Sequence, residues 1–148
     1  MAATDSLAQL IDIAQSACDD AARRLGNAQR LVTQAETKRD LLAGYWSDYQ
    51  ARQRSIYQAD ATRMANFHDF LAKLKSTINA HEADMALARA GLDEARRDWE
   101  LAQRRLKSLE NLSGRRRAQA KTMLDRAQQK LQDEISTQRL MRGMTQPG

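Results

Sequence analysis

A seven-residue repeat of apolar residues constrains this chain more than any other feature. It begins near the N-terminus and returns without a break at Leu7, Ala14, Ala21, Ala28, Ala35, Leu42 and Tyr49. A second row follows three residues after the first, at Leu10, Ala17, Arg24, Leu31, Lys38 and Tyr45, and the stripe is widened by Ile11, Cys18, Leu25 and Val32. Two apolar rows with this spacing form one face of a coiled-coil helix. We therefore predict a long coiled-coil helix over residues 6–53.

A second repeat begins at Phe67 and alternates steps of four and three residues. Its positions are Phe67, Leu71, Leu74, Ile78, His81, Met85, Ala88, Leu92, Ala95, Trp99, Ala102, Leu106 and Leu109, and all except the histidine are apolar. This repeat predicts a second helix over residues 66–142. It breaks at residues 113–117 and resumes in a shifted frame as Ala120, Leu124, Ala127, Leu131 and Ile135.

Residues 54–65 carry no apolar stripe and are predicted to form a bend at the tip of the fold. The sole proline is Pro147, so no proline interrupts either helix. Two long helices joined by one bend form an antiparallel coiled-coil hairpin in an all-α fold. This pairing sets Ala28 beside about residue 90. Residues beyond about 115 then have no partner in the first helix, which predicts a C-terminal helical overhang or a frayed tail.

Charge is distributed unevenly along the chain. Residues 1–20 contain four Asp and no Lys or Arg, so they carry −4, whereas residues 114–148 contain eight Lys or Arg against three Asp or Glu, so they carry +5. The basic run at residues 115–117 has three interpretations: a solvated helix face, a docking site for an acidic protein surface, or a phosphate contact with nucleic acid. No aromatic residue is interleaved with this run.

The sequence gives no support for catalysis. It contains two histidines, His68 and His81, and no recognisable nucleophile, zinc or phosphate-loop motif. Cys18 is the sole cysteine and excludes an intrachain disulfide. No apolar run is long enough to cross a membrane, and the first residues lack the basic start of a secretory signal. We expect no catalytic residue, metal site or cofactor, and a cytoplasmic location.

Aromatic residues are concentrated near the predicted bend. Six of the seven lie between residues 45 and 70: Tyr45, Trp46, Tyr49, Tyr57, Phe67 and Phe70. They could simply fill the wide end of the coiled coil. A two-helix hairpin, however, has one buried seam and cannot cover all of them. Exposed aromatic clusters mark interaction sites, so we predict a binding surface at the tip.

Several of these segments resemble the FliJ family, the coiled-coil proteins of the bacterial flagellar export apparatus. The similar pieces before residue 50 are the L-x-x-L-x-x-x-A opening, DDAARRLG at 19–26, QAE at 34–36 and the spacing of Tyr45 and Tyr49. NFHDFLAKLKSTINAH at 66–81 and Trp99 continue the likeness, which weakens after about residue 110.

The resemblance implies a non-enzymatic role in flagellum biogenesis, protein export and motility, with chemotaxis as an associated process. It implies a central stalk that promotes assembly and activation of the hexameric export ATPase FliI. It also implies contact with the export-gate membrane protein FlhA, a chaperone-escort role with export chaperones, and a peripheral, membrane-associated position at the cytoplasmic face of the inner membrane.

The resemblance also implies which residues make these contacts. The gate-binding surface would comprise Leu42, Tyr45, Tyr49, Phe70, Leu74 and His81, while Lys38 and Thr77 on the same surface differ in type from the family pattern. The ATPase-binding end would include Arg115, Arg116, Arg117 and Lys121. Three alternatives stay open: a related stalk of virulence type III secretion, a nucleic-acid-associated coiled coil that uses the basic C-terminal helix, and a structural coiled coil without a fixed partner.

Overall fold

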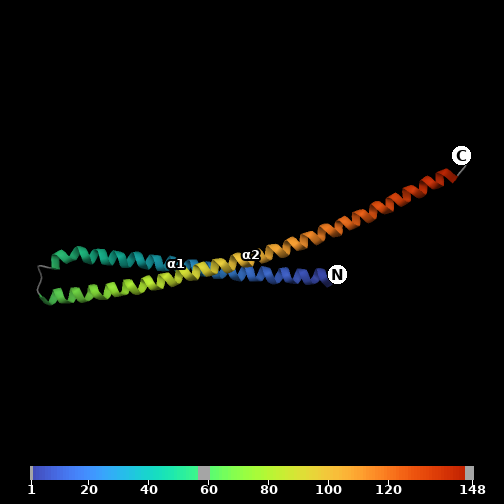
Figure 1. The fold of residues 1–148 in the computed structure, drawn as a ribbon. Helices are drawn as coiled ribbons and strands as arrows, with labels where there is room; N and C mark the ends of the chain where they lie inside the picture. Colours follow the sequence, from blue (N-terminus) through green and yellow to red (C-terminus); the bar gives the residue numbers. More distant parts are fainter. Residues whose placement is uncertain (1, 57–60, 146–148) are drawn as a thin grey trace. The chain divides into compact units, whose positions relative to one another are not determined.

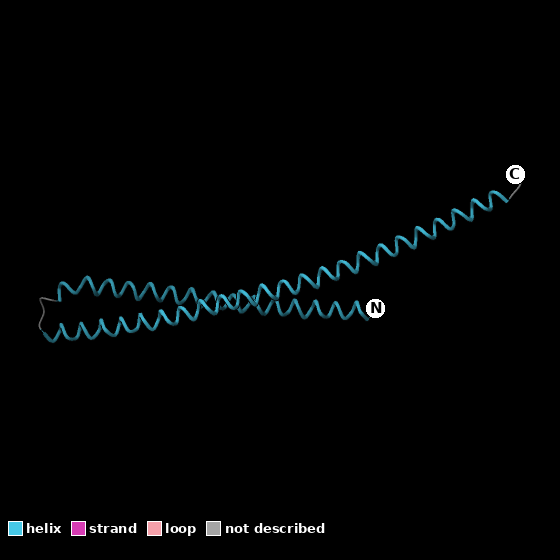
Figure 2. Tube along the Cα trace, viewed as in Figure 1, coloured by secondary structure: helices cyan, strands magenta, loops and turns pink. Residues whose placement is uncertain are grey.

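The chain forms two long α-helices in the computed structural model, which describes residues 2–56 and 61–145. Helix α1 runs over Ala2–Ile56 and helix α2 over Ala61–Thr145. Every described residue is helical (Figure 2), so the predicted all-α fold is confirmed. Both helices extend into the predicted bend of 54–65, and residues 57–60 at its centre, including Tyr57, lie outside the described residues.

Contacts divide the chain into two units. The central unit is Gln15–Gln103, and the terminal unit joins Met1–Ala14 to Arg104–Gly148. In the central unit α1 and α2 lie side by side and run in opposite directions (Figure 1), which is the predicted antiparallel pairing. Ala28 and Ala88 line one groove of this unit, so the helix register is close to the predicted one.

The seam of α2 follows the predicted repeat throughout. All thirteen predicted positions are buried or half-buried, and Phe67, Leu74 and Met85 are the most deeply covered apolar residues among them. Side chains spaced alternately by four and three residues return to the same face of a helix, and here that face meets α1. Burial of this stripe excludes apolar surface from water, which is the main favourable contribution to pairing.

The second row predicted for α1 is wrong. Leu10, Ala17, Arg24, Leu31, Lys38 and Tyr45 are all exposed. The row one residue later is covered at Ile11, Cys18, Leu25, Val32 and Trp46, and exposed at Arg39. The first row, from Leu7 to Tyr49, is covered as predicted. From Leu7, the covered positions of α1 are therefore separated by four and then three residues, in the same order as on α2. Arg24 and Lys38 remain exposed to solvent.

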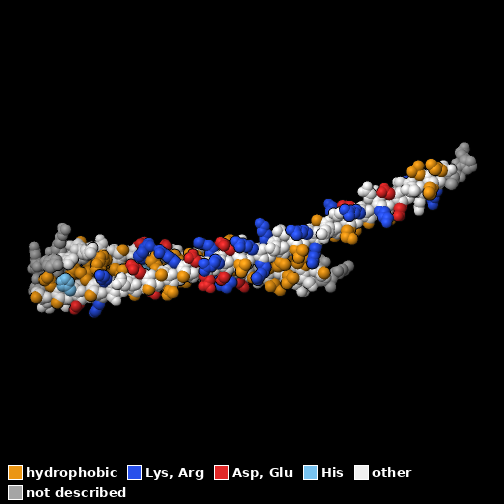
Figure 3. Space-filling view, viewed as in Figure 1, with side chains coloured by type: hydrophobic (Ala, Val, Ile, Leu, Met, Phe, Trp, Pro, Cys, Tyr) orange, Lys and Arg blue, Asp and Glu red, His pale blue; other side chains and the backbone are white. Residues whose placement is uncertain are grey.

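Helix α2 continues far beyond its last covered residue. Ser113 is half-buried, whereas every residue from Gly114 to Met144 is exposed. The row predicted in a shifted frame is therefore not a buried seam, because α1 offers it no partner: Leu124 and Leu131 are 65% and 61% exposed. Figure 3 shows hydrophobic side chains at the surface of this last part of α2, interspersed with Lys and Arg.

Candidate functional site

Three aromatic rings meet where the two helices of the central unit approach residues 57–60. The ring centroid of Tyr49 on α1 lies 4.4 Å from that of Phe70 and 6.0 Å from that of Phe67, both on α2. The rings are tilted by 37° and 44°, a geometry that aromatic pairs favour over a parallel sandwich. The Arg52 guanidinium carbon lies 5.7 Å from the Tyr49 centroid, within the range of a cation–π contact.

The aromatic residues differ sharply in exposure. Phe67 is buried and Tyr49 is half-buried, whereas Phe70 is 42% exposed and Tyr45 is 52% exposed. Because one seam covers only one face of each helix, the surplus rings remain at the surface, as the residue count predicted. Among the described aromatic residues near the bend, Phe70 and Tyr45 are therefore the two that are exposed.

The remaining residues of the predicted gate-binding surface lie closer to the seam. Leu42 is half-buried, and Leu74 and His81 are buried against α1. Lys38 is exposed, and Thr77 is also exposed, with its hydroxyl donating to the Lys73 carbonyl across 3.0 Å.

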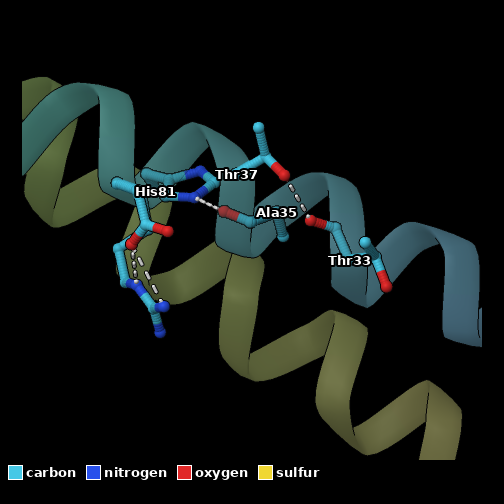
Figure 4. A network of polar contacts seen from close by, with 6 residues as sticks. Thr33, Ala35, Thr37 and His81 are labelled. Atoms are coloured by element: carbon cyan, nitrogen blue, oxygen red, sulfur yellow. Dashed lines mark hydrogen bonds and ion pairs between the residues drawn. The ribbon is translucent and has the colours of Figure 1, made fainter.

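His81 makes a specific contact between the helices. Its Nε2 lies 2.7 Å from the backbone carbonyl oxygen of Ala35 and donates to it (Figure 4). The carbonyl can only accept, so this contact requires the proton on Nε2. A buried imidazole that finds a partner avoids the cost of an unsatisfied polar group.

Trp46 borders a groove that the sequence analysis missed. The groove has a volume of about 360 Å³ and lies between α1 and α2, and its lining combines Trp46, Ala43 and Ile78 with the polar residues Arg39, Lys75, Asn79 and Glu82. The predicted second row ended at Tyr45, whereas the covered row of Ile11, Cys18, Leu25 and Val32 continues to Trp46. Its spacing of fourteen residues from Val32 was the available signal.

The predicted ATPase-binding residues form a basic, exposed segment of α2 in the terminal unit. Arg115, Arg116, Arg117 and Lys121 are all exposed. Arg116 Nη1 donates to the Ala3 carbonyl across 3.4 Å, and Arg117 Nη2 lies 3.4 Å from Ser113 Oγ. Among the described residues, one long hydrogen bond joins this segment to the start of α1, from Arg116 to Ala3.

A second groove lies in the terminal unit between the start of α1 and this basic segment. It has a volume of about 420 Å³ and is lined by Leu7, Ala8, Ile11 and Asp12 from α1 and by Ser113, Arg116, Arg117 and Ala120 from α2. An acidic and two basic side chains therefore share one mostly apolar groove. The opposite charges predicted for the two chain ends meet here.

Within residues 2–56 and 61–145, no group of three His, Cys, Asp or Glu side chains is placed to hold a metal ion. In the same residues, neither helix has an apolar stretch long enough to cross a membrane.

Comparison with known proteins connects this arrangement to one family. The family model described as "Flagellar FliJ protein" matches residues 3–145. The Flagellar FliJ protein of Escherichia coli (strain K12) is 31% identical over 144 residues, which cover 96% of this chain and 98% of the relative. The Flagellar FliJ protein of Salmonella typhi is 31% identical over 148 residues, with the same coverage.

Proposed function

Because the chain belongs to the FliJ family of non-enzymatic flagellar export proteins, we propose that it acts as a stalk for the hexameric export ATPase FliI and couples that ATPase to the export gate. As a FliJ protein it is a component of flagellar protein export and flagellum biogenesis, and thereby of motility. The proposal has three specific parts: a stalk for the ATPase, a contact with the export gate, and an escort role for export chaperones.

One observation carries the stalk proposal. From Gly114 to Met144, α2 is helical and every side chain is exposed. A helix that is open on all faces can be contacted around its whole circumference, which the interior of a protein ring requires. The segment begins with Arg115, Arg116 and Arg117, whose positive charges would favour acidic loops and steer association.

Ring assembly tests this part of the proposal. The purified ATPase is incubated with the chain, and hexamers are counted by negative-stain electron microscopy. Replacing Arg115, Arg116 and Arg117 with Glu is expected to abolish the gain in hexamers. The matched control replaces Arg89, Arg96 and Arg97 with Glu, because these exposed arginines give the same charge change in the central unit. Equal loss in both variants would contradict a role for the basic segment.

The gate proposal rests on the exposed aromatic surface. Tyr45 and Phe70 offer aromatic area to a partner, and buried aromatic side chains dominate many protein interfaces. Leu42 and Tyr49 would add their exposed edges. Leu74 and His81 are buried in the hairpin, so they would not contact the gate directly. They would support the exposed surface by holding α2 in register with α1.

Binding to the cytoplasmic part of FlhA tests the gate proposal. Tyr45→Ala is expected to weaken binding by about tenfold or more, as truncation of an interface aromatic does. Ile13→Ala is the control, since Ile13 is 66% exposed and belongs to the terminal unit. Equal affinity of Tyr45→Ala and the unchanged chain in calorimetry would count against this surface.

Export chaperones are the third proposed partner. The exposed row of Leu124, Leu131 and Ile135 supports this part, because it offers a helix face to which an amphipathic helix could pack. A position at the cytoplasmic face of the inner membrane would follow from binding to the gate.

Nucleic-acid binding is the weaker alternative. The basic segment is exposed, but the described part of α2 after Gly114 carries no aromatic side chain for base stacking. Binding of duplex DNA that weakens steeply with salt would favour the alternative.

A further inference from the structure

A second pair of heptad rows lies beside the seam of the central unit. On α1 the row is Ala17, Arg24 and Leu31, and on α2 it is Leu87, Glu94 and Leu101. All six residues are exposed, and the three leucines are between 58% and 72% exposed. Leu87 and Leu101 lie two heptads apart on the same exposed row, and an apolar residue that returns at heptad intervals is typical of a helix that packs against another helix.

These rows border a groove between the two helices. Leu31 and Arg24 line it from α1, and Leu87, Glu94 and Asp98 line it from α2. The groove has a volume of about 420 Å³, and Asn27 completes its lining together with four small residues: Ala28, Ala88, Gly91 and Ala95. A Cβ at Gly91 would meet nothing within 4 Å. The small side chains therefore leave room for leucines from an opposing surface.

Charge is arranged in levels along the groove. The leucine level holds Leu31 and Leu87, and the charged level holds Arg24 on α1 with Glu94 and Asp98 on α2. None of these three charged side chains makes an ion pair among the residues that the structure describes. At this level the α1 side of the groove is positive and the α2 side is negative. The surface is therefore complementary in charge to a copy of itself rotated by 180°.

We propose that this groove joins two copies of the chain in parallel, about a two-fold axis that runs along the groove. This rotation sets α1 of one copy against α2 of the other. Leu31 then packs against Leu87 of the partner subunit, and Arg24 faces Glu94 of the partner subunit. The interface is isologous, because the same patch serves both copies.

The charges select this arrangement over the antiparallel one. A two-fold axis across the groove at the charged level would set each Arg24 against its own counterpart and each Glu94 against its own counterpart. Like charges in direct opposition are unfavourable. The parallel arrangement replaces both repulsions with attractions and keeps leucine opposite leucine.

Light scattering after size-exclusion chromatography of the full-length chain tests the proposal. We expect a dimer whose fraction rises with protein concentration. Combined Leu31→Glu and Leu87→Glu substitutions are expected to raise the dimer Kd by about a hundredfold. Circular dichroism should report unchanged helix content, because both positions are exposed. The matched control is Leu124→Glu on the C-terminal part of α2, which should leave the Kd unchanged.

Charge reversal tests the symmetry. Arg24→Glu alone, and Glu94→Arg with Asp98→Arg alone, should each raise the dimer Kd by at least about tenfold. An equimolar mixture of the two variants should form a mixed dimer with the original Kd. In that dimer, the α1 side of each copy again faces an α2 side of opposite charge.

Three results would overturn the proposal. The first is a monomer at every concentration up to near-millimolar. The second is a dimer that Leu124→Glu disrupts and the Leu31 and Leu87 substitutions do not. The third is a mixture of the charge-reversed variants that stays monomeric, because a parallel two-fold interface requires the mixed dimer.

Discussion

His81 and Ala35 are joined by a hydrogen bond between the two helices, in which the imidazole Nε2 donates to the backbone carbonyl oxygen across 2.7 Å. His81 is the one non-apolar residue among the thirteen seam positions of α2 from Phe67 to Leu109. A single buried polar residue in a coiled-coil seam can specify register, because in a shifted register it loses its partner. The contact therefore stabilises one pairing of α1 with α2.

Replacement of His81 tests this contact. His81→Ala is expected to lower the free energy of unfolding by about 1–2 kcal/mol, since it removes both the hydrogen bond and buried side-chain volume. His81→Leu should lose less, because leucine refills the seam. Urea unfolding followed by circular dichroism provides the measurement. His68→Ala is the control, as His68 is exposed, and an equal effect there would contradict the account.

Two neighbouring aromatic residues test the observed seam of α1. Trp46 is half-buried in the covered row, whereas Tyr45 is 52% exposed. We expect Trp46→Ala to cost about 2 kcal/mol of stability, roughly half of what a fully buried tryptophan costs, and Tyr45→Ala to cost less than about 0.5 kcal/mol. Thermal and urea unfolding of both variants would measure this. A larger loss for Tyr45→Ala would restore the row that the sequence analysis predicted.

Removal of the exposed part of α2 should leave the paired helices intact. Truncation after Gly114 removes a segment that is exposed at every position from Arg115 to Met144, and it breaks the long hydrogen bond from Arg116 to Ala3. The expected change in the free energy of unfolding is below about 1 kcal/mol. A calorimetric scan of the truncated chain checks this. A drop of several kcal/mol would mean that the segment packs against the rest of the protein.

The sequence predicted the two helices, their antiparallel pairing and the complete seam of α2. That success has a physical reason: the four-and-three steps through Phe67, Leu74 and Met85 place apolar residues at twelve of thirteen positions on one helix face. On α1, two adjacent rows are both largely apolar, since Leu10, Leu31 and Tyr45 compete with Ile11, Val32 and Trp46. Arg24 was the signal that favoured the covered row, because the next residue is Leu25, whereas Lys38 gave no signal, because the next residue is Arg39.

The candidate surfaces were less predictable than the helices. Sequence placed the aromatic residues near the bend, but it could not decide which side of each helix faces water, because that depends on the row that α1 buries. Phe70 and Tyr45 are exposed while Phe67 is buried, three residues from Phe70. The exposure of Leu124 and Leu131 follows from the difference in length between the helices. Because α2 is longer than α1, its last apolar row has no partner within the described chain.

The most direct test of the stalk proposal is ATP hydrolysis by the purified export ATPase, titrated with this protein at physiological salt. Full-length protein is compared with the chain truncated after Gly114 and with an unrelated basic coiled coil. The account predicts that the full-length chain alone raises turnover. Equal stimulation by the unrelated coiled coil, or no stimulation by any of the three, would contradict it.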